Sequence, residues 1–195
     1  MSFFDNPRNA GLALMIVSLI NIIGGIVLII LGAINYEGYN LTQSVILGIG
    51  EIICGALMFM YGQKVRGGAI SAKIEILAQF VRVIGVITII GGIFAAIANI
   101  AIGADIGASI VGAIVAIILG LIIMFIGSKI NDGKQTIGDK LIWIILLIAF
   151  VIMILVAIVE IISIVGIING ICDLIVYIFM LILLVDPEVK KEMNM

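Results

Sequence analysis

The chain has 195 residues, of which 64% are hydrophobic and 11% charged, and its formal net charge at pH 7 is −2. A chain with so few polar residues cannot cover the surface of a water-soluble core of this size. The composition therefore predicts a membrane protein whose partner is the lipid bilayer. The absence of histidine excludes His-based catalytic triads and zinc motifs, and the absence of a basic tract excludes nucleic-acid binding.

Six apolar runs follow one another, each close to the roughly 20 residues that cross a hydrocarbon layer of about 30 Å. They are 10–34, 42–62, 81–102, 107–127, 141–159 and 164–185. The first is longer than the core of a signal peptide, so we expect it to be retained. The sequence predicts an all-α polytopic membrane protein with six transmembrane helices in a single membrane domain, 1–195.

The ten basic residues all fall on one side of this pattern. They are Arg8 before the first run, Lys64, Arg66, Lys73 and Arg82 between the second and third, Lys129, Lys134 and Lys140 between the fourth and fifth, and Lys190 and Lys191 after the sixth. The other three connections contain no Lys or Arg, and their only charged residues are Glu37, Asp105 and Glu160. Because insertion retains Lys and Arg in the cytoplasm, we expect a multi-pass cell-membrane protein with cytoplasmic N- and C-termini.

An internal repeat organises the chain. LINIIGG at 19–25 matches VITIIGG at 86–92, and GALMFMYGQK at 55–64 matches GLIIMFIGSK at 120–129, with offsets of 67 and 65. A degenerate third copy at 141–185 follows at an offset of 118. Since each copy crosses twice, the pattern predicts three parallel two-helix hairpins. The repeat units are 10–68, 77–133 and 141–185.

Small residues recur every seven positions within the first four runs. They are Gly11, Ser18, Gly25 and Gly32; Gly48, Gly55 and Gly62; Gly85 and Gly92; Ala113, Gly120 and Gly127. Lipid provides no hydrophobic drive between helices, so such seams favour association through close backbone contact. We interpret these glycines as packing positions.

The stretch 64–82 has an amphipathic pattern. Its apolar residues recur at helical spacing: Ile70, Ile74, Leu77 and Val81. The pattern indicates a short helix that lies in the headgroup plane or extends the third span, and its length favours the extension. This stretch is also where we expect a homo-oligomer or a larger membrane complex to form. Tyr61 and Trp143 are expected in an aromatic belt at the same membrane face.

Three polar residues stand near the middle of apolar runs: Asn21, Glu51 and Asp173. An ionisable group at this depth costs about 2.5–3.5 kcal/mol, so function is the default hypothesis. Asn169 precedes Asp173 by one helical turn, and Glu51 shares the seam face, so both carboxylates are expected to point inward. We predict no catalytic residues, no metal ligands and no cofactor.

If the three hairpins close into a ring, Asn21, Glu51, Asn169 and Asp173 share one polar cavity. With no intramembrane Lys or Arg to pair with, the carboxylates must be protonated, bind a cation or meet water. A proton or metal cation is then the natural ligand. Alternatively, both carboxyls are neutral and fix helix register, a reading that the lack of proline in these spans favours.

Four segments carry a resemblance to a known family: IIGGIVLIILG at 22–32, IIGGIFAAIAN at 89–99, GALMFMYG at 55–62 and GLIIMFIG at 120–127. They resemble the HdeD-type short-repeat membrane proteins, over nearly the whole chain. The resemblance implies a non-enzymatic membrane protein linked in some bacteria to acid resistance.

We therefore predict an integral membrane protein without catalytic activity that serves as a structural, stress-related or accessory membrane component. One alternative is a small proton or cation channel or carrier that uses Glu51 and Asp173. Another is the membrane subunit of a larger transporter complex.

Overall fold

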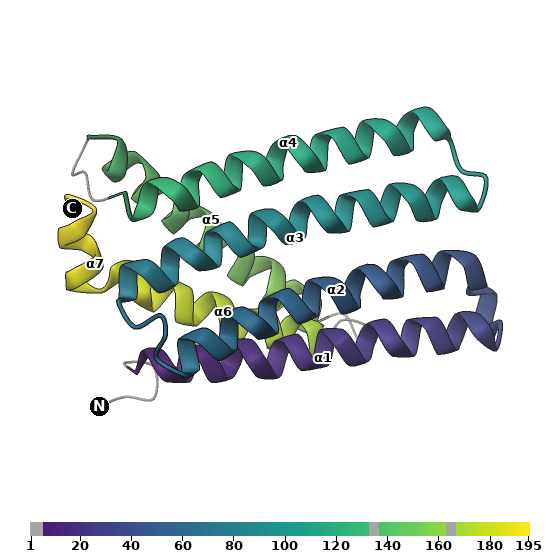
Figure 1. Cartoon of the computed structure of the whole chain (residues 1–195), viewed down its shortest axis with the longest axis horizontal. Helices are drawn as coiled ribbons and strands as arrows, with labels where there is room; N and C mark the ends of the chain where they lie inside the picture. The colour runs from purple at the N-terminus through teal and green to yellow at the C-terminus, as the bar shows by residue number, and fades with distance from the viewer. Residues whose placement is uncertain (1–5, 133–136, 163–166) are drawn as a thin grey trace. The chain divides into compact units, whose positions relative to one another are not determined.

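A computed structural model describes residues 6–132, 137–162 and 167–195, with the backbone alone at 37, 137 and 167–169 (Figure 1). Every regular element in these ranges is a helix: α1 (Pro7–Ala33), the 3-10 turn η2 (Tyr36–Gly38), α2 (Leu41–Arg66), α3 (Lys73–Ala101), α4 (Ile106–Ile130), α5 (Ile137–Ile162), α6 (Ile167–Val185) and α7 (Pro187–Glu192). Among the described residues, α1 to α4 and the Gly138–Ile162 part of α5 are long and apolar enough to cross a membrane. The chain is thus all-α, with the multiple membrane-length helices of a polytopic membrane protein.

The sixth predicted span, 164–185, corresponds to α6. Residues 163–166 lie outside the described ranges, and the apolar part Gly170–Val185 is shorter than the other five membrane-length helices. Helix α6 is followed directly by Asp186, whose side chain accepts a hydrogen bond from the Glu188 backbone N–H and so caps α7. Whether α6 makes a sixth crossing stays a prediction.

The chain comprises two compact units. Unit 1 consists of Met1–Val17, Tyr61–Phe80 and Ile126–Met195, and unit 2 of Ser18–Met60 and Val81–Phe125. The division falls within α1 to α4 and does not follow the predicted repeat boundaries. Every described Lys and Arg except Arg82 belongs to unit 1.

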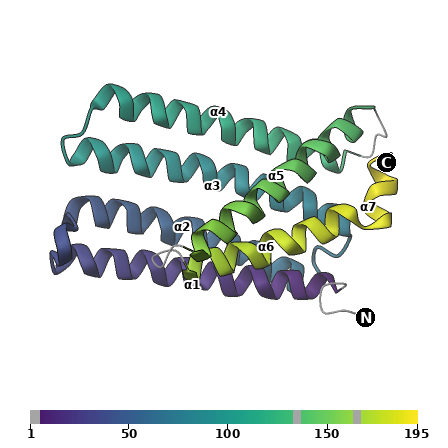
Figure 2. The ribbon, with the colours of Figure 1, turned by 180° about the vertical axis from the view of Figure 1, so that it is seen from behind.

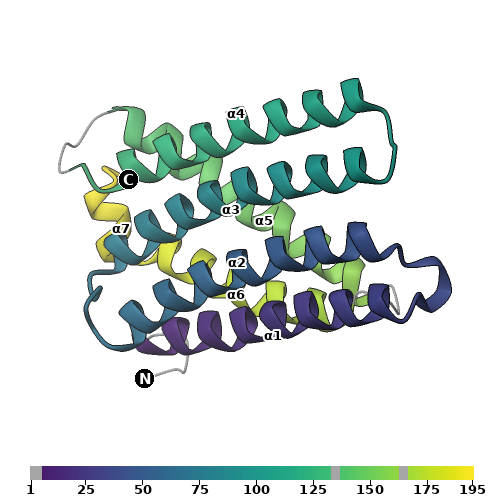
Figure 3. The same ribbon diagram turned by 45° about the vertical axis from the view of Figure 1, so that its right-hand side comes forward.

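Unit 2 is a layer of four helix segments that lie side by side in chain order, α1 to α4 (Figures 1 and 3). Its outward-facing large side chains are widely exposed; Ile30 is 52% exposed and Val111 60%. Within the described part of the unit, the buried apolar side chains are Met58, Val81, Ala96 and Ala98. Unit 2 therefore depends on close contact between neighbouring helices, because it has almost no apolar core.

The close contacts follow the predicted seams. A Cβ added to Gly25 would lie 2.6 Å from the Gly48 carbonyl oxygen, and one added to Gly85 would lie 2.7 Å from that of Gly120. In unit 1, a Cβ on Gly11 would lie 2.9 Å from the carbonyl oxygen of Gly62. The interpretation of these glycines as packing positions is confirmed. The backbones approach so closely that any side chain would have to displace main-chain atoms.

One seam contact differs between the first two hairpins. Gly25 faces Gly48, which corresponds to Ala113 of α4, whereas Gly92, the equivalent of Gly25, faces Ala116. Under the offset of 65 residues, Ala116 corresponds to Glu51 of α2. The methyl group of Ala116 is small enough for α3 to approach it directly, which the longer Glu51 side chain does not allow on α2.

Equivalent positions of the first two hairpins make the same contacts. A Cβ on Gly55 would meet Ile22, and a Cβ on Gly120 would meet Ile89, which the offsets relate to Ile22. The connections also match, because Gly38 and Gly103 both adopt positive φ, at 86° and 80°. Such φ values favour glycine, which has no Cβ to clash with the backbone.

Unit 1 contains the apolar core of the chain. Its largest fully buried apolar side chains are Phe80, Phe179, Leu14, Ile76, Leu77, Met180, Leu184, Met193, Val65 and Val189. Helices α5 and α6 pack together (Figure 2), and a Cβ added to Gly170 would lie 2.7 Å from the Ala157 carbonyl oxygen. Phe150 joins this core through ring contacts to Phe80, at 6.2 Å between centroids, and to Tyr177.

Two aromatic residues expected at a membrane interface are instead buried in unit 1. Tyr61 is 4% exposed and its hydroxyl donates to the Ile76 carbonyl oxygen. Trp143 is 9% exposed and its Nε1–H donates to the Leu184 carbonyl oxygen at 2.9 Å. The belt prediction was wrong for both, because backbone acceptors on a neighbouring segment replace the headgroup region as partners of their polar atoms.

The amphipathic stretch 64–82 includes the end of α2, the connection 67–72 and the start of α3. Helix α3 begins at Lys73 and continues to Ala101, so the predicted extension of the third span is confirmed. The apolar face, including Ile70, Ile74 and Leu77, is buried in unit 1. A partner on this stretch would meet exposed polar residues such as Lys64 and Arg66 instead.

Candidate functional site

Glu51 lies on α2 in unit 2, where Gly48 and Gly55 form the seam against α1. Its carboxylate oxygen Oε2 is 3.7 Å from the position of a Cβ on Gly24, and its own Cβ is 3.1 Å from that of Gly25. The side chain nevertheless stays exposed. Residue 51 lies at the edge of the seam. Glu51 therefore lies beside α1 but is not enclosed, although the sequence predicted an inward-pointing carboxylate. Asn21, one turn before Gly24 and Gly25 on α1, is also exposed.

Asp173 lies on α6 in unit 1 and is half-buried. Helix α5, which packs against α6, carries a second carboxylate near its end, Glu160, and Tyr177 lies one turn beyond Asp173 on α6. Glu160 had been assigned to a connection, but α5 continues to Ile162 and includes it. The apolar run that continues past residue 160 was the signal for this. The side chain of Asn169 lies outside the described part of the chain.

The four predicted site residues are divided between the units. Asn21 and Glu51 belong to unit 2, and Asn169 and Asp173 belong to unit 1. Their shared polar cavity therefore stays a prediction. Among the described residues there is no group of three or more His, Cys, Asp or Glu side chains that could hold a metal ion.

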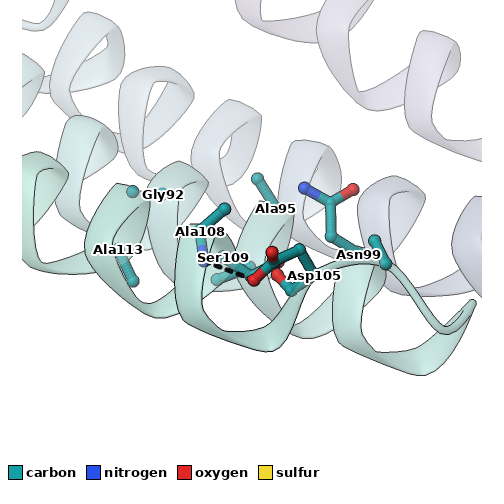
Figure 4. Close-up of a pocket in the computed structure, with 10 residues that line it drawn as sticks. Gly92, Ala95, Asn99, Asp105, Ala108, Ser109 and Ala113 are labelled. Atoms are coloured by element: carbon teal, nitrogen blue, oxygen red, sulfur yellow. Dashed lines mark hydrogen bonds between the residues drawn. The ribbon is translucent and has the colours of Figure 1, made fainter.

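A cavity that sequence reasoning missed lies in unit 2 between α3 and α4, next to the connection that joins them (Figure 4). We call it the α3–α4 notch. Its volume is about 430 Å³. It is lined by Gly92, Ala95, Ala96, Asn99, Ala104, Asp105, Ala108, Ser109, Gly112 and Ala113. The signal in the sequence was the concentration of Ala and Gly on facing turns of the two helices.

The polar residues of the notch gather at the end near the connection. Asp105 precedes α4 and caps it, since Oδ1 accepts a hydrogen bond from the Ala108 backbone N–H at 2.9 Å (Figure 4). The Ser109 hydroxyl donates to the Asp105 carbonyl oxygen at 2.8 Å. Asn99 enters from the last turns of α3. The notch thus has an apolar floor of small residues and a polar rim with one carboxylate.

A smaller cavity of about 270 Å³ occupies the corresponding place between α1 and α2. It is lined by Leu28, Gly38, Tyr39, Asn40, Gln43, Ser44 and Leu47. With the offsets of 67 and 65 residues, all of these except Gly38 correspond to residues that line the α3–α4 notch. Asn40 even makes the same cap as Asp105, because its Oδ1 accepts from the Gln43 backbone N–H at 3.1 Å.

The resemblance to the HdeD-type proteins stays a prediction that rests on the quoted motifs. Comparison of the chain with protein-family models, curated proteins and solved structures found no match.

Proposed function

We propose that this chain is a multi-pass membrane protein without catalytic activity that acts as a structural, stress-related or accessory component of the cell membrane. The observation that carries the proposal is the way in which the helices of unit 2 pack together. Four helix segments contact one another through small residues while their large apolar side chains remain exposed, as Val111 and Phe125 are, at 60% and 63%. Such a surface is stable only when lipid or another apolar partner covers it.

The same proposal includes six crossings, three hairpins and cytoplasmic termini. The distribution of basic residues supports this topology, because Arg8, Lys73 and Lys140 lie near the starts of α1, α3 and α5, and Lys64, Arg66 and Lys129 lie near the ends of α2 and α4. The matching glycine contacts and helix caps of the first two hairpins support their duplication. The third hairpin rests on the sequence offset alone.

Cysteine labelling tests the topology. In a background with Cys54→Ala and Cys172→Ala, we expect a membrane-impermeant maleimide to label Thr42→Cys from outside intact cells. Lys64→Cys and Glu192→Cys should react only after permeabilisation, because retained Lys and Arg hold their segments in the cytoplasm. All three positions are exposed. Labelling of Glu192→Cys from outside would show that α6 does not cross the membrane.

A second candidate function, a proton or cation pathway, is favoured by the surroundings of Glu51. Its carboxylate has no hydrogen bond or ion pair with the described residues, and Arg82 is the one basic residue in the sequence of unit 2. An uncompensated carboxylate at mid-span is stable in lipid only when it is protonated, bound to a cation or in contact with water. All three states suit a residue that transfers protons or cations.

Flux measurements in proteoliposomes test this candidate. If Glu51 and Asp173 form a pathway, proton or cation flux should disappear in both Glu51→Gln and Asp173→Asn, because each loses the charge that binds the ion. Glu192→Gln, which removes an exposed carboxylate outside the spans, is the matched control and should conduct normally. No flux in the wild type, with lower thermal stability of the two variants, would make the carboxyls structural.

A further inference from the structure

We propose that the α3–α4 notch binds an amphiphilic ammonium ion, with the ammonium group at Asp105 and an alkyl chain along the floor of small residues. This ligand site goes beyond the proposed function, which requires no ligand. The inference rests on the shape of the cavity, on its charge, and on the contrast with the corresponding cavity between α1 and α2.

The shape suits one small ligand with an apolar tail. The volume of about 430 Å³ lies within the range of small-molecule sites, roughly 300–1,000 Å³. Gly92, Ala95, Ala96 and Ala113 provide an apolar floor, and Asp105 and Asn99 are placed at the polar end. An alkyl chain on this floor gains contacts with both helices that a solvated cavity lacks.

The charge selects a cation. One oxygen of Asp105, Oδ1, caps α4, while Oδ2 has no hydrogen-bond partner among the described residues. The positive end of the α4 dipole amounts to about half a charge, so the full negative charge of the carboxylate outweighs it. No Lys or Arg occurs in the sequence between Arg82 and Lys129. A ligand that carries its own phosphate would therefore lack a basic partner, which favours a simple ammonium ion over a phospholipid headgroup.

The cavity between α1 and α2 shows which features are particular to the notch; this comparison rests on the proposed duplication. Leu28 and Leu47 correspond to Ala95 and Gly112, so the cavity of the second hairpin has two fewer large side chains than that of the first. Asn40 corresponds to Asp105. Because Asn40 caps α2 as Asp105 caps α4, capping alone does not require the carboxylate. The second hairpin thus adds room and negative charge, the two properties that an amphiphilic cation needs.

Equilibrium binding of radiolabelled dodecylammonium to the full chain in phosphatidylcholine nanodiscs tests the proposal, with empty nanodiscs as the background. We expect a saturable component that Asp105→Asn weakens roughly tenfold or more, since the variant loses a charge-assisted hydrogen bond but keeps the cap. Gly112→Leu should abolish the component by filling the notch. Its Cβ meets nothing within 4 Å, so the variant fills space without straining the fold.

Gly91→Leu is the matched control, because a Cβ on Gly91 also meets nothing within 4 Å and Gly91 does not line the notch. It should bind as the wild type does. Thermal unfolding of each variant separates lost binding from lost folding. The proposal is overturned by the absence of saturable binding, by unchanged affinity in Asp105→Asn, or by phosphatidylethanolamine in the nanodisc displacing the probe. The last result would assign the notch to a lipid headgroup. None of these outcomes depends on the flux or topology measurements.

Discussion

Replacing Gly25 with leucine destabilises the α1–α2 hairpin, whereas the same replacement at the adjacent Gly24 is tolerated. A Cβ on Gly25 would lie 2.6 Å from the Gly48 carbonyl oxygen, so the two backbones must separate. A Cβ on Gly24 would lie 3.7 Å from Glu51 Oε2, an ordinary contact. Overpacking costs about 1–3 kcal/mol or more. Leucine recovers nearly 1 kcal/mol of helix propensity in both variants. We therefore expect a net loss of stability only for Gly25→Leu.

The free energy of unfolding in mixed micelles, measured by titration with a denaturing detergent, gives the comparison directly. The second hairpin offers an independent copy of the experiment. Gly92 abuts Ala116, while a Cβ on Gly91 meets nothing within 4 Å. Equal losses at both members of each glycine pair would mean that glycine is needed for backbone flexibility, and would contradict the seam.

Replacing Leu184 with alanine removes a side chain from the core of unit 1 and should lower the free energy of unfolding by about 2–5 kcal/mol. Leu184 is fully buried on α6, next to Met180 and Leu183, which are also buried. The cost has two parts, the lost contacts and the cavity that remains, because packed neighbours relax only partly. This should be among the most damaging truncations in the chain.

Leu155→Ala on α5 is the matched control, since Leu155 belongs to the same unit but is 57% exposed. Lipid chains can occupy the space that this truncation opens, so its effect should stay below about 1 kcal/mol. Detergent-induced unfolding of both variants provides the comparison. If Leu155→Ala cost as much as Leu184→Ala, the exposed face of α5 would be an interface that is covered in the membrane.

Helix positions and seams were predictable because both follow from local spacing. Apolar runs long enough to cross a bilayer must form helices, since lipid offers no other partner for backbone N–H and C=O groups. The period of seven residues relates Gly11 to Gly25 on α1 and Gly48 to Gly62 on α2, and it marks helix faces that favour close contact. In the structure, Gly11 lies against Gly62 and Gly25 against Gly48. The extension of the third span towards its N-terminus, where α3 begins at Lys73, followed from the apolar periodicity in the same way.

The surroundings of the buried aromatic side chains and of the carboxylates were not predictable in this way. Trp143 and Tyr61 have the pattern of interface residues, yet each finds a backbone carbonyl oxygen on a segment distant in sequence. Glu160 has the sequence position of a connection residue, but it lies inside α5, the helix that packs against the α6 of Asp173. Which acceptor or carboxylate lies opposite depends on how neighbouring segments are placed, and spacing within one helix carries no information on that.

At the α3–α4 notch, too, some features were predictable from the sequence and others only from the packed structure. The alanines and glycines that line it are visible in the sequence, and the offsets of 67 and 65 residues relate them to the first hairpin. Only the packed helices show that Ala95 and Gly112 leave space beside Asp105, rather than allowing the helices to close over it. The sequence by itself determined the membrane class, the helices and the small-residue seams along them, because these depend on hydrophobicity and periodicity along the chain. The tertiary structure decided the core of unit 1, the notch and the surroundings of each carboxylate, because these depend on which side chains meet across helices.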